Sequence, residues 1–126
     1  MVLSHNDSVK LFRNSAPYIN AHRGKTFVLM FGGEAVEDAN FANIIQDIAL
    51  LNSLGVRLIL VHGARPQIDQ RAVWRKVEPR FSEDVRITDK QTLECVKDAA
   101  GSVRSQIEAL LTMGLANSPM HGAQIR

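Results

Sequence analysis

The most informative segment for the architecture of this chain is Lys25-Thr26-Phe27-Val28-Leu29-Met30-Phe31-Gly32-Gly33. Within it, an unbroken apolar run over 27–31 ends at a pair of glycines. Such a run is typical of a strand that is buried on both faces of a sheet. We therefore expect a doubly covered strand over 25–31, followed by a sharp turn at the two glycines.

A helix and a second apolar run follow this strand. From Asn40 to Asn52, apolar side chains recur at helical spacing, and Gly55 lies where such a helix would stop. Val56 to Val61 is the second run. A strand, a crossover helix and another strand imply a parallel pair, because antiparallel neighbours do not need the helix. The sequence thus predicts the start of an α/β sheet.

Two shorter helical patterns flank this unit. Residues Ser8 to His22 carry a loose apolar stripe, which predicts a helix with a bend or a restart at Pro17. A short helix is expected over Pro66 to Lys76, before a loop around Pro79.

The last expected helix has a recognisable start. Thr88, followed three residues later by Gln91, matches a capping box, and the helix should end near Gly114. The apolar stripe expected along it consists of Leu93, Val96, Ala100, Val103, Ile107, Leu110 and Leu111. The tail from Asn117 to Arg126 shows no closing element. Because two strands leave open sheet edges, we expect the fold to be unfinished at the end of this chain.

Length and composition restrict the class of protein. The 126 residues leave room for one domain at most, and 45% hydrophobic with 22% charged residues is typical of a folded soluble chain. Fifteen basic and 13 acidic residues are spread without a block of like sign, which argues against nucleic-acid and membrane partners. The single Cys95 and the absence of a secretory signal or a long apolar span favour a cytoplasmic protein.

Two glycine-bearing turns are candidate ligand loops. The first turn, Gly32-Gly33-Glu34, and the second turn, His62-Gly63-Ala64-Arg65-Pro66, each follow an expected strand. In a parallel sheet, ligands bind beyond the carboxyl ends of the strands. Neither turn matches the phosphate loop or the dinucleotide fingerprint. Gly32, Gly33 and Gly63 are therefore candidate ligand contacts. The alternative, that a strand-to-helix turn favours glycine in any protein, stays open.

Two arginines are candidates for binding a carboxylate. Arg65 in the second turn and Arg86 just before the last helix have guanidinium groups suited to bidentate pairing. A solvated or structurally paired arginine is the alternative. The four histidines lack ligand spacing, so we expect no metal site, and no catalytic dyad or triad is visible. Cys95 is expected to be a packing residue.

Three segments resemble the amino-acid kinase fold as found in N-acetylglutamate kinases and synthases. They lie over 17–35, Val61 to Ile68 and Val85 to Asp89, in the order of the family. The resemblance implies a three-layer α/β fold with a mainly parallel sheet, of which this chain is the N-terminal portion. It also implies an N-terminal helical segment over 1–24 and an incomplete kinase-like domain over 25–126.

Two departures from the kinase pattern are similar to the synthases. Active kinases usually carry a lysine two residues before the paired glycines, where this chain has Met30, and a thioether cannot neutralise phosphate charge. Kinases usually read His-Gly-Gly-Gly-Pro in the second turn, whereas Ala64 and Arg65 stand here and would crowd a ligand. The resemblance therefore implies a regulatory segment without catalytic residues.

The same resemblance implies the function of the complete protein. It would transfer the acetyl group of acetyl-CoA to L-glutamate in the first step of arginine biosynthesis, through a C-terminal acetyltransferase domain that this chain lacks. L-arginine is the expected effector, and Tyr18 in the N-terminal helix is expected to contribute to assembly of a homo-oligomer and to feedback inhibition. No cofactor is expected in this segment. Two alternatives stay open: an N-acetylglutamate kinase that tolerates Met30, and a free-standing, non-catalytic arginine-sensing or assembly module.

Overall fold

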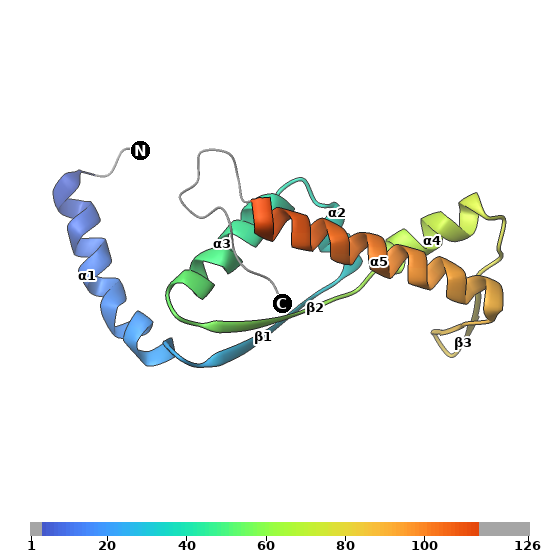
Figure 1. Ribbon diagram of the computed structural model, residues 1–126, viewed down its shortest axis with the longest axis horizontal. Helices are drawn as coiled ribbons and strands as arrows, with labels where there is room; N and C mark the ends of the chain where they lie inside the picture. Colours follow the sequence, from blue (N-terminus) through green and yellow to red (C-terminus); the bar gives the residue numbers. More distant parts are fainter. Residues whose placement is uncertain (1–3, 114–126) are drawn as a thin grey trace.

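The computed structural model describes residues 4–113, which form five helices, a parallel pair of strands and a separate hairpin (Figure 1). In chain order the elements are α1 (His5–His22), β1 (Thr26–Phe31), α2 (Gly33–Glu37), α3 (Phe41–Ser53), β2 (Arg57–His62), α4 (Arg65–Trp74), β3 (Arg80–Ser82), β4 (Val85–Ile87) and α5 (Lys90–Met113).

Strands β1 and β2 form the expected parallel pair. Their register runs from Thr26 opposite Arg57 to Phe31 opposite His62, and α2 and α3 make the crossover between them. The predicted stop of α3 is also confirmed, because Gly55 follows it with a φ of 91°, a conformation that glycine adopts without strain.

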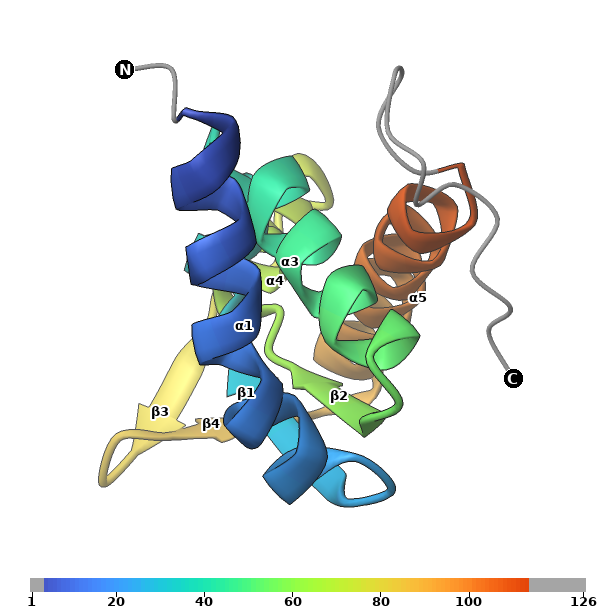
Figure 2. The same ribbon diagram turned by 90° about the vertical axis from the view of Figure 1, so that its left-hand side faces the viewer.

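The core lies on one side of this sheet. Helices α3 and α5 cover the same face of β1 and β2, as Figures 1 and 2 show together. The buried residues of this core are Val36, Phe41, Ile45, Ile48, Val103 and Ile107, and the partly buried strand residues packed against them are Leu29, Phe31, Leu58 and Leu60. The expected long helix, α5, therefore contributes to the core through the C-terminal half of its predicted apolar stripe.

The expectation that the strand at 25–31 is buried on both faces is wrong for the part of the chain that the structure describes. Burial alternates along both strands, and Val28 and Met30 are 64% and 82% exposed. Ile59 and Val61 are exposed beside them on β2. The side chains are apolar on both faces, but helices cover only one of them.

Helix α1 extends away from this core (Figure 1) and contains no buried residue. It begins three residues earlier than expected, because the Ser4 hydroxyl accepts a hydrogen bond from the Asp7 main-chain N–H over 3.2 Å. Pro17 lies inside one continuous helix, so the expected restart does not occur.

Helix α5 begins one residue later than the capping box at Thr88 predicted. The capping residue is Asp89, whose carboxylate accepts from the Thr92 main-chain N–H over 2.8 Å. Near the start of the helix the buried stripe is displaced by one residue in the opposite direction: Thr92, Cys95 and Ala99 are buried, whereas Leu93 is 44% exposed. The packing role expected for Cys95 is confirmed by its complete burial. The expected stop at Gly114 and the tail at 117–126 lie outside the described residues.

The hairpin of β3 and β4 was not predicted. Glu83 and Asp84 connect the strands with φ values of 48° and 62°, a left-handed pair that matches the twist of a two-residue hairpin. The pattern was missed because the pair lacks the Asn-Gly or Asp-Gly sequence that usually marks such a turn.

Candidate functional site

The two glycine-bearing turns lie against each other. Strands β1 and β2 are parallel, so their carboxyl ends meet at the same edge of the sheet. The Gly63 main-chain N–H donates to the Phe31 oxygen over 2.9 Å, and a β-carbon on Gly63 would lie 3.3 Å from the Gly33 nitrogen. The structure thus brings together the three glycines that the sequence singled out as candidate ligand contacts, Gly32, Gly33 and Gly63.

Gly33 is surrounded by the start of α4. A β-carbon at this position would lie 2.9 Å from both the Ala64 α-carbon and the Pro66 Cδ, and it would overlap the side-chain oxygen of Gln67. Gly33 is therefore required by close packing between the first turn and the second. This finding supports the structural explanation for this glycine.

Gly32 has a different environment. A β-carbon there would meet the carboxylate of Glu34, which lies beside the start of α2. A negative charge at this end complements the partial positive charge of a helix N-terminus. An anion approaching Gly32 would meet this carboxylate first.

Gln67 is a residue of this site that the sequence analysis did not identify. It is 7% exposed, and its Nε2 donates to the Gly33 main-chain oxygen over 2.8 Å. Local pattern gives no signal for this contact, because the partner lies 34 positions earlier and a glutamine in the first turn of a helix is usually exposed.

The two candidate arginines lie in different surroundings. Arg65 is exposed, and its side chain has no hydrogen bond or ion pair with another residue over 4–113. Arg86 is mostly buried, pairs with Asp69 of α4, and has its guanidinium carbon 4.8 Å from the centre of the Phe81 ring. The carboxylate of Asp69 thus already occupies part of the hydrogen-bonding capacity of the Arg86 guanidinium. Its Nη1 is buried without a hydrogen-bond partner among the described residues.

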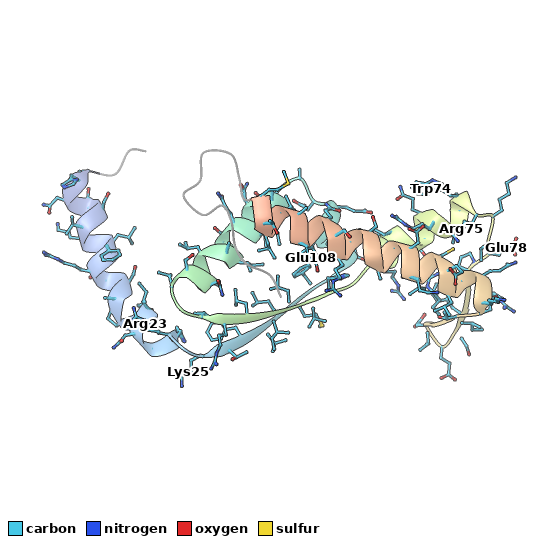
Figure 3. All side chains as sticks on the ribbon, viewed as in Figure 1. Arg23, Lys25, Trp74, Arg75, Glu78 and Glu108 are labelled. Atoms are coloured by element: carbon cyan, nitrogen blue, oxygen red, sulfur yellow. The ribbon has the colours of Figure 1, made fainter. Side chains whose placement is uncertain are left out.

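Ion pairs join α4 to the elements beside it. Asp98 of α5 lies 3.8 Å from Arg71 and 3.3 Å from Arg75, which Figure 3 labels near the end of α4. At the start of α5, the Thr92 main-chain N–H, the Thr92 side chain and the Arg80 guanidinium lower the pKa of Asp89 from 3.8 to about 2. The site edge is therefore connected to α5 through charged side chains of α4.

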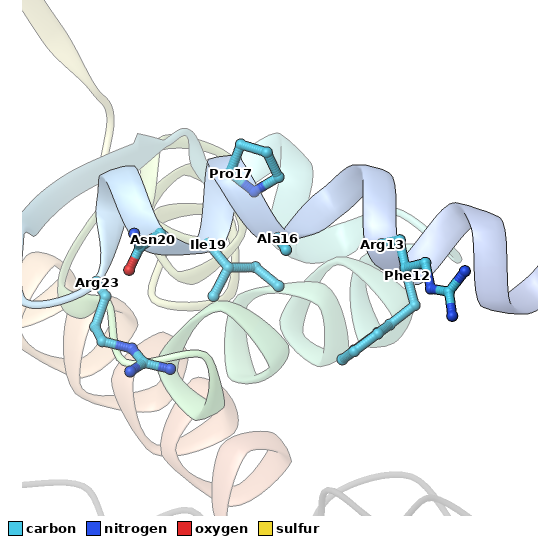
Figure 4. A pocket seen from close by; sticks show the side chains of 7 residues that line it. All are labelled: Phe12, Arg13, Ala16, Pro17, Ile19, Asn20 and Arg23. Atoms are coloured by element: carbon cyan, nitrogen blue, oxygen red, sulfur yellow. The ribbon is translucent and has the colours of Figure 1, made fainter.

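Tyr18, the expected assembly residue, lies on α1 and is 70% exposed. An open hollow of about 530 Å³ runs along the same helix (Figure 4). It is lined by Phe12, Arg13, Ala16, Pro17, Ile19, Asn20 and Arg23.

Met30 is exposed on the uncovered sheet face, and its thioether gives this edge of the site no positive charge. Over residues 4–113 no group of three or more His, Cys, Asp or Glu side chains is arranged to hold a metal ion. Nor does any helix in the described range have the length and apolar character needed to cross a membrane.

Comparison with known proteins places these features in a family. The Amino acid kinase family profile matches residues 25–126. The amino-acid acetyltransferases of Pseudomonas aeruginosa PAO1 and Azotobacter vinelandii are 56% and 58% identical over 120 residues, which cover 95% of this chain. The same alignments cover only 28% of each relative, so this chain spans a little over a quarter of their length.

Solved structures of relatives give the same result. The crystal structure of N-acetylglutamate synthase from Neisseria gonorrhoeae complexed with coenzyme A and L-arginine superposes with a TM-score of 0.70 at 38% identity. The match covers 88% of this chain and 27% of that one. A second structure of that enzyme, complexed with coenzyme A and N-acetyl-glutamate, matches at 39% identity over 82% of this chain and 24% of that one, also with a TM-score of 0.70. The chain therefore belongs to the amino acid kinase family and is similar to the N-terminal, kinase-like part of N-acetylglutamate synthases.

Proposed function

We propose that this chain is the structural and regulatory, kinase-like part of an N-acetylglutamate synthase. The complete protein transfers the acetyl group of acetyl-CoA to the amino group of L-glutamate, the first step of arginine biosynthesis. The observation that carries the proposal is the identity of 56–58% with amino-acid acetyltransferases over 95% of the chain. Acetyl-CoA is a substrate of the complete enzyme, and this segment itself holds no cofactor.

The glycine turns support a segment without phosphoryl transfer. Met30 stands where family kinases carry a lysine. The space beside Gly33 is occupied by residues at the start of α4. Arg86 pairs with Asp69 instead of being free for a substrate carboxylate. Phosphoryl transfer relies on positive groups that stabilise charge in the transition state, and the described part of this edge offers only the exposed Arg65.

L-arginine is the proposed effector, and the proposed assembly is a homo-oligomer in the cytoplasm. The Neisseria relative was solved as a complex with L-arginine. Helix α1 supports a role in assembly, because it buries no residue while Phe12 and Tyr18 are 71% and 70% exposed. An N-terminal helical segment over 1–24 and a kinase-like unit over 25–126 are the proposed division of the chain.

Two assays on the purified protein that carries this chain at its native length test the proposal. We expect acetyl transfer from acetyl-CoA to L-glutamate that L-arginine inhibits, and no ATP-dependent phosphorylation of N-acetylglutamate. Met30→Ala should leave acetyl transfer unchanged, because Met30 is expected to have no catalytic role.

The same assays separate the two alternatives. Phosphorylation of N-acetylglutamate without acetyl transfer would assign the protein as a kinase that tolerates Met30. An intact mass of 14.0 kDa in the source cells, with thermal stabilisation by L-arginine and neither activity, would assign a free-standing sensing module.

A further inference from the structure

Gln67 is a buried amide that reaches from α4 to the first turn. Its Nε2 donates to the Gly33 main-chain oxygen over 2.8 Å, and 7% of the residue is exposed. Its Oε1 is buried and has no hydrogen-bond partner among the described residues. The side chain therefore makes one strong polar contact, and that contact is between the two candidate ligand turns.

The chemistry of the neighbours fixes the orientation of this amide. Reversing it would place Oε1 against the Gly33 oxygen, and two acceptors repel each other. In the observed orientation Oε1 occupies the place where a β-carbon on Gly33 would stand, so any side chain on Gly33 would displace it. The Gln67 side chain can thus reach the Gly33 oxygen because Gly33 has no β-carbon in the way.

Burying the polar amide of Gln67 costs free energy that an apolar side chain of the same size would not cost. A buried amide oxygen without a partner loses its hydration, whereas an apolar side chain of similar length, such as methionine, carries no such penalty. The hydrogen bond from Nε2 to the Gly33 oxygen, at the start of α2, offsets part of this cost.

We propose that Gln67 is a positioning residue that fixes the distance between the two turns, so that the first turn and the start of α4 move as one unit. Helix α4 is in turn joined to β4 by Asp69–Arg86 and to α5 by Asp98. Gln67 thereby connects the end of β1 to this network of charged contacts. The proposal rests on the geometry of this chain and does not depend on the proposed acetyl transfer.

Hydrogen exchange of the native protein, followed by mass spectrometry over the two turns, tests the inference. Gln67→Met keeps the volume and removes the donor. We expect it to speed exchange in both turns by about tenfold, the effect of losing one buried hydrogen bond, with no change around Val103 in α5.

The variant Gln67→Glu adds a second measurement, the pH dependence of exchange, which would not change if Gln67 only filled space. In Gln67→Glu, the protonated acid can donate to the Gly33 oxygen, whereas the ionised form repels it. After correction for intrinsic exchange, we expect the two turns to become less protected as the pH rises from about 4 to about 8. Gln70→Glu, an exposed position on the same helix, is the matched control and should show no such dependence.

Three results would overturn the proposal. Gln67→Met with wild-type protection of the turns would show that the residue only fills space. Equal loss of protection in α5 would show general destabilisation without a local role. A Gln67→Glu variant whose turns exchange independently of pH would show that the donor does not matter.

Discussion

The carboxylate of Asp89 accepts a hydrogen bond from the Thr92 main-chain N–H over 2.8 Å and so caps α5. Together with Thr92 and Arg80 this contact lowers the pKa of Asp89 from 3.8 to about 2. Since the pKa is lower in the folded state, the stabilising contribution is present above pH 4 and is lost as the pH falls towards 2.

Asp89→Ala is therefore expected to lower the melting temperature at neutral pH, with a difference from wild type that shrinks between about pH 4 and pH 2. Circular dichroism melts across this pH range measure it. Thr88→Ala is the control, because the structure assigns the cap to the next residue, and it should leave the melting temperature nearly unchanged. If Thr88→Ala lowered the melting temperature more than Asp89→Ala does, the capping box at Thr88 that the sequence predicted would be correct.

The displaced cap shows why some of the fold could be predicted and some could not. The parallel pair followed from the order of two apolar runs around a helix, because this order permits few topologies. The cap of α5 lies one residue later than predicted, at Asp89, whereas the buried side chain near its start lies one residue earlier, at Thr92 instead of Leu93. Packing against α4 and α3 determines which face of α5 is buried, and the local sequence pattern does not contain this information.

The site was predictable to a similar extent. The meeting of the glycine turns follows from parallel strands, so Gly32, Gly33 and Gly63 were placed correctly at one edge. The contact from Gln67 was not predictable, because it depends on the distance between two backbone segments. The partner of Arg86 was missed for the same reason, since Asp69 lies 17 residues away on a different element.

The register of α5 can be tested by two truncations on that helix. Ile107 is 4% exposed in the core, and Ile107→Ala should lower the free energy of unfolding by about 3 kcal/mol, through lost burial and a residual cavity. Leu93→Ala should change it by no more than about 0.5 kcal/mol, because Leu93 is 44% exposed. Urea unfolding measures both, and equal losses would contradict the observed register.

The uncovered sheet face should make the isolated chain of 126 residues self-associate. Val28 is 64% exposed on this face, and Ile59 lies exposed on the neighbouring strand. We expect the double variant Val28→Ser, Ile59→Ser to raise the monomer fraction in sedimentation while helix content stays constant. Leu29→Ser, on the adjacent but core-facing position, should instead unfold the chain. A monodisperse wild-type monomer would contradict this prediction.

Two glycine-to-alanine substitutions test the close packing of the turns. At Gly33 the new β-carbon would lie 2.9 Å from the Ala64 α-carbon, which is main chain and cannot rotate away. Gly33→Ala should therefore lower the free energy of unfolding by about 1–3 kcal/mol, as overpacking does. At Gly101, inside α5, no heavy atom lies within 4 Å of the added carbon. Gly101→Ala should raise stability by about 0.5–1 kcal/mol, because alanine loses less backbone entropy in a helix. Urea unfolding of both variants gives the comparison. If Gly33→Ala were as stable as wild type, the second turn would have to move away from the first, and Gln67 would not fix the distance between the two turns as proposed.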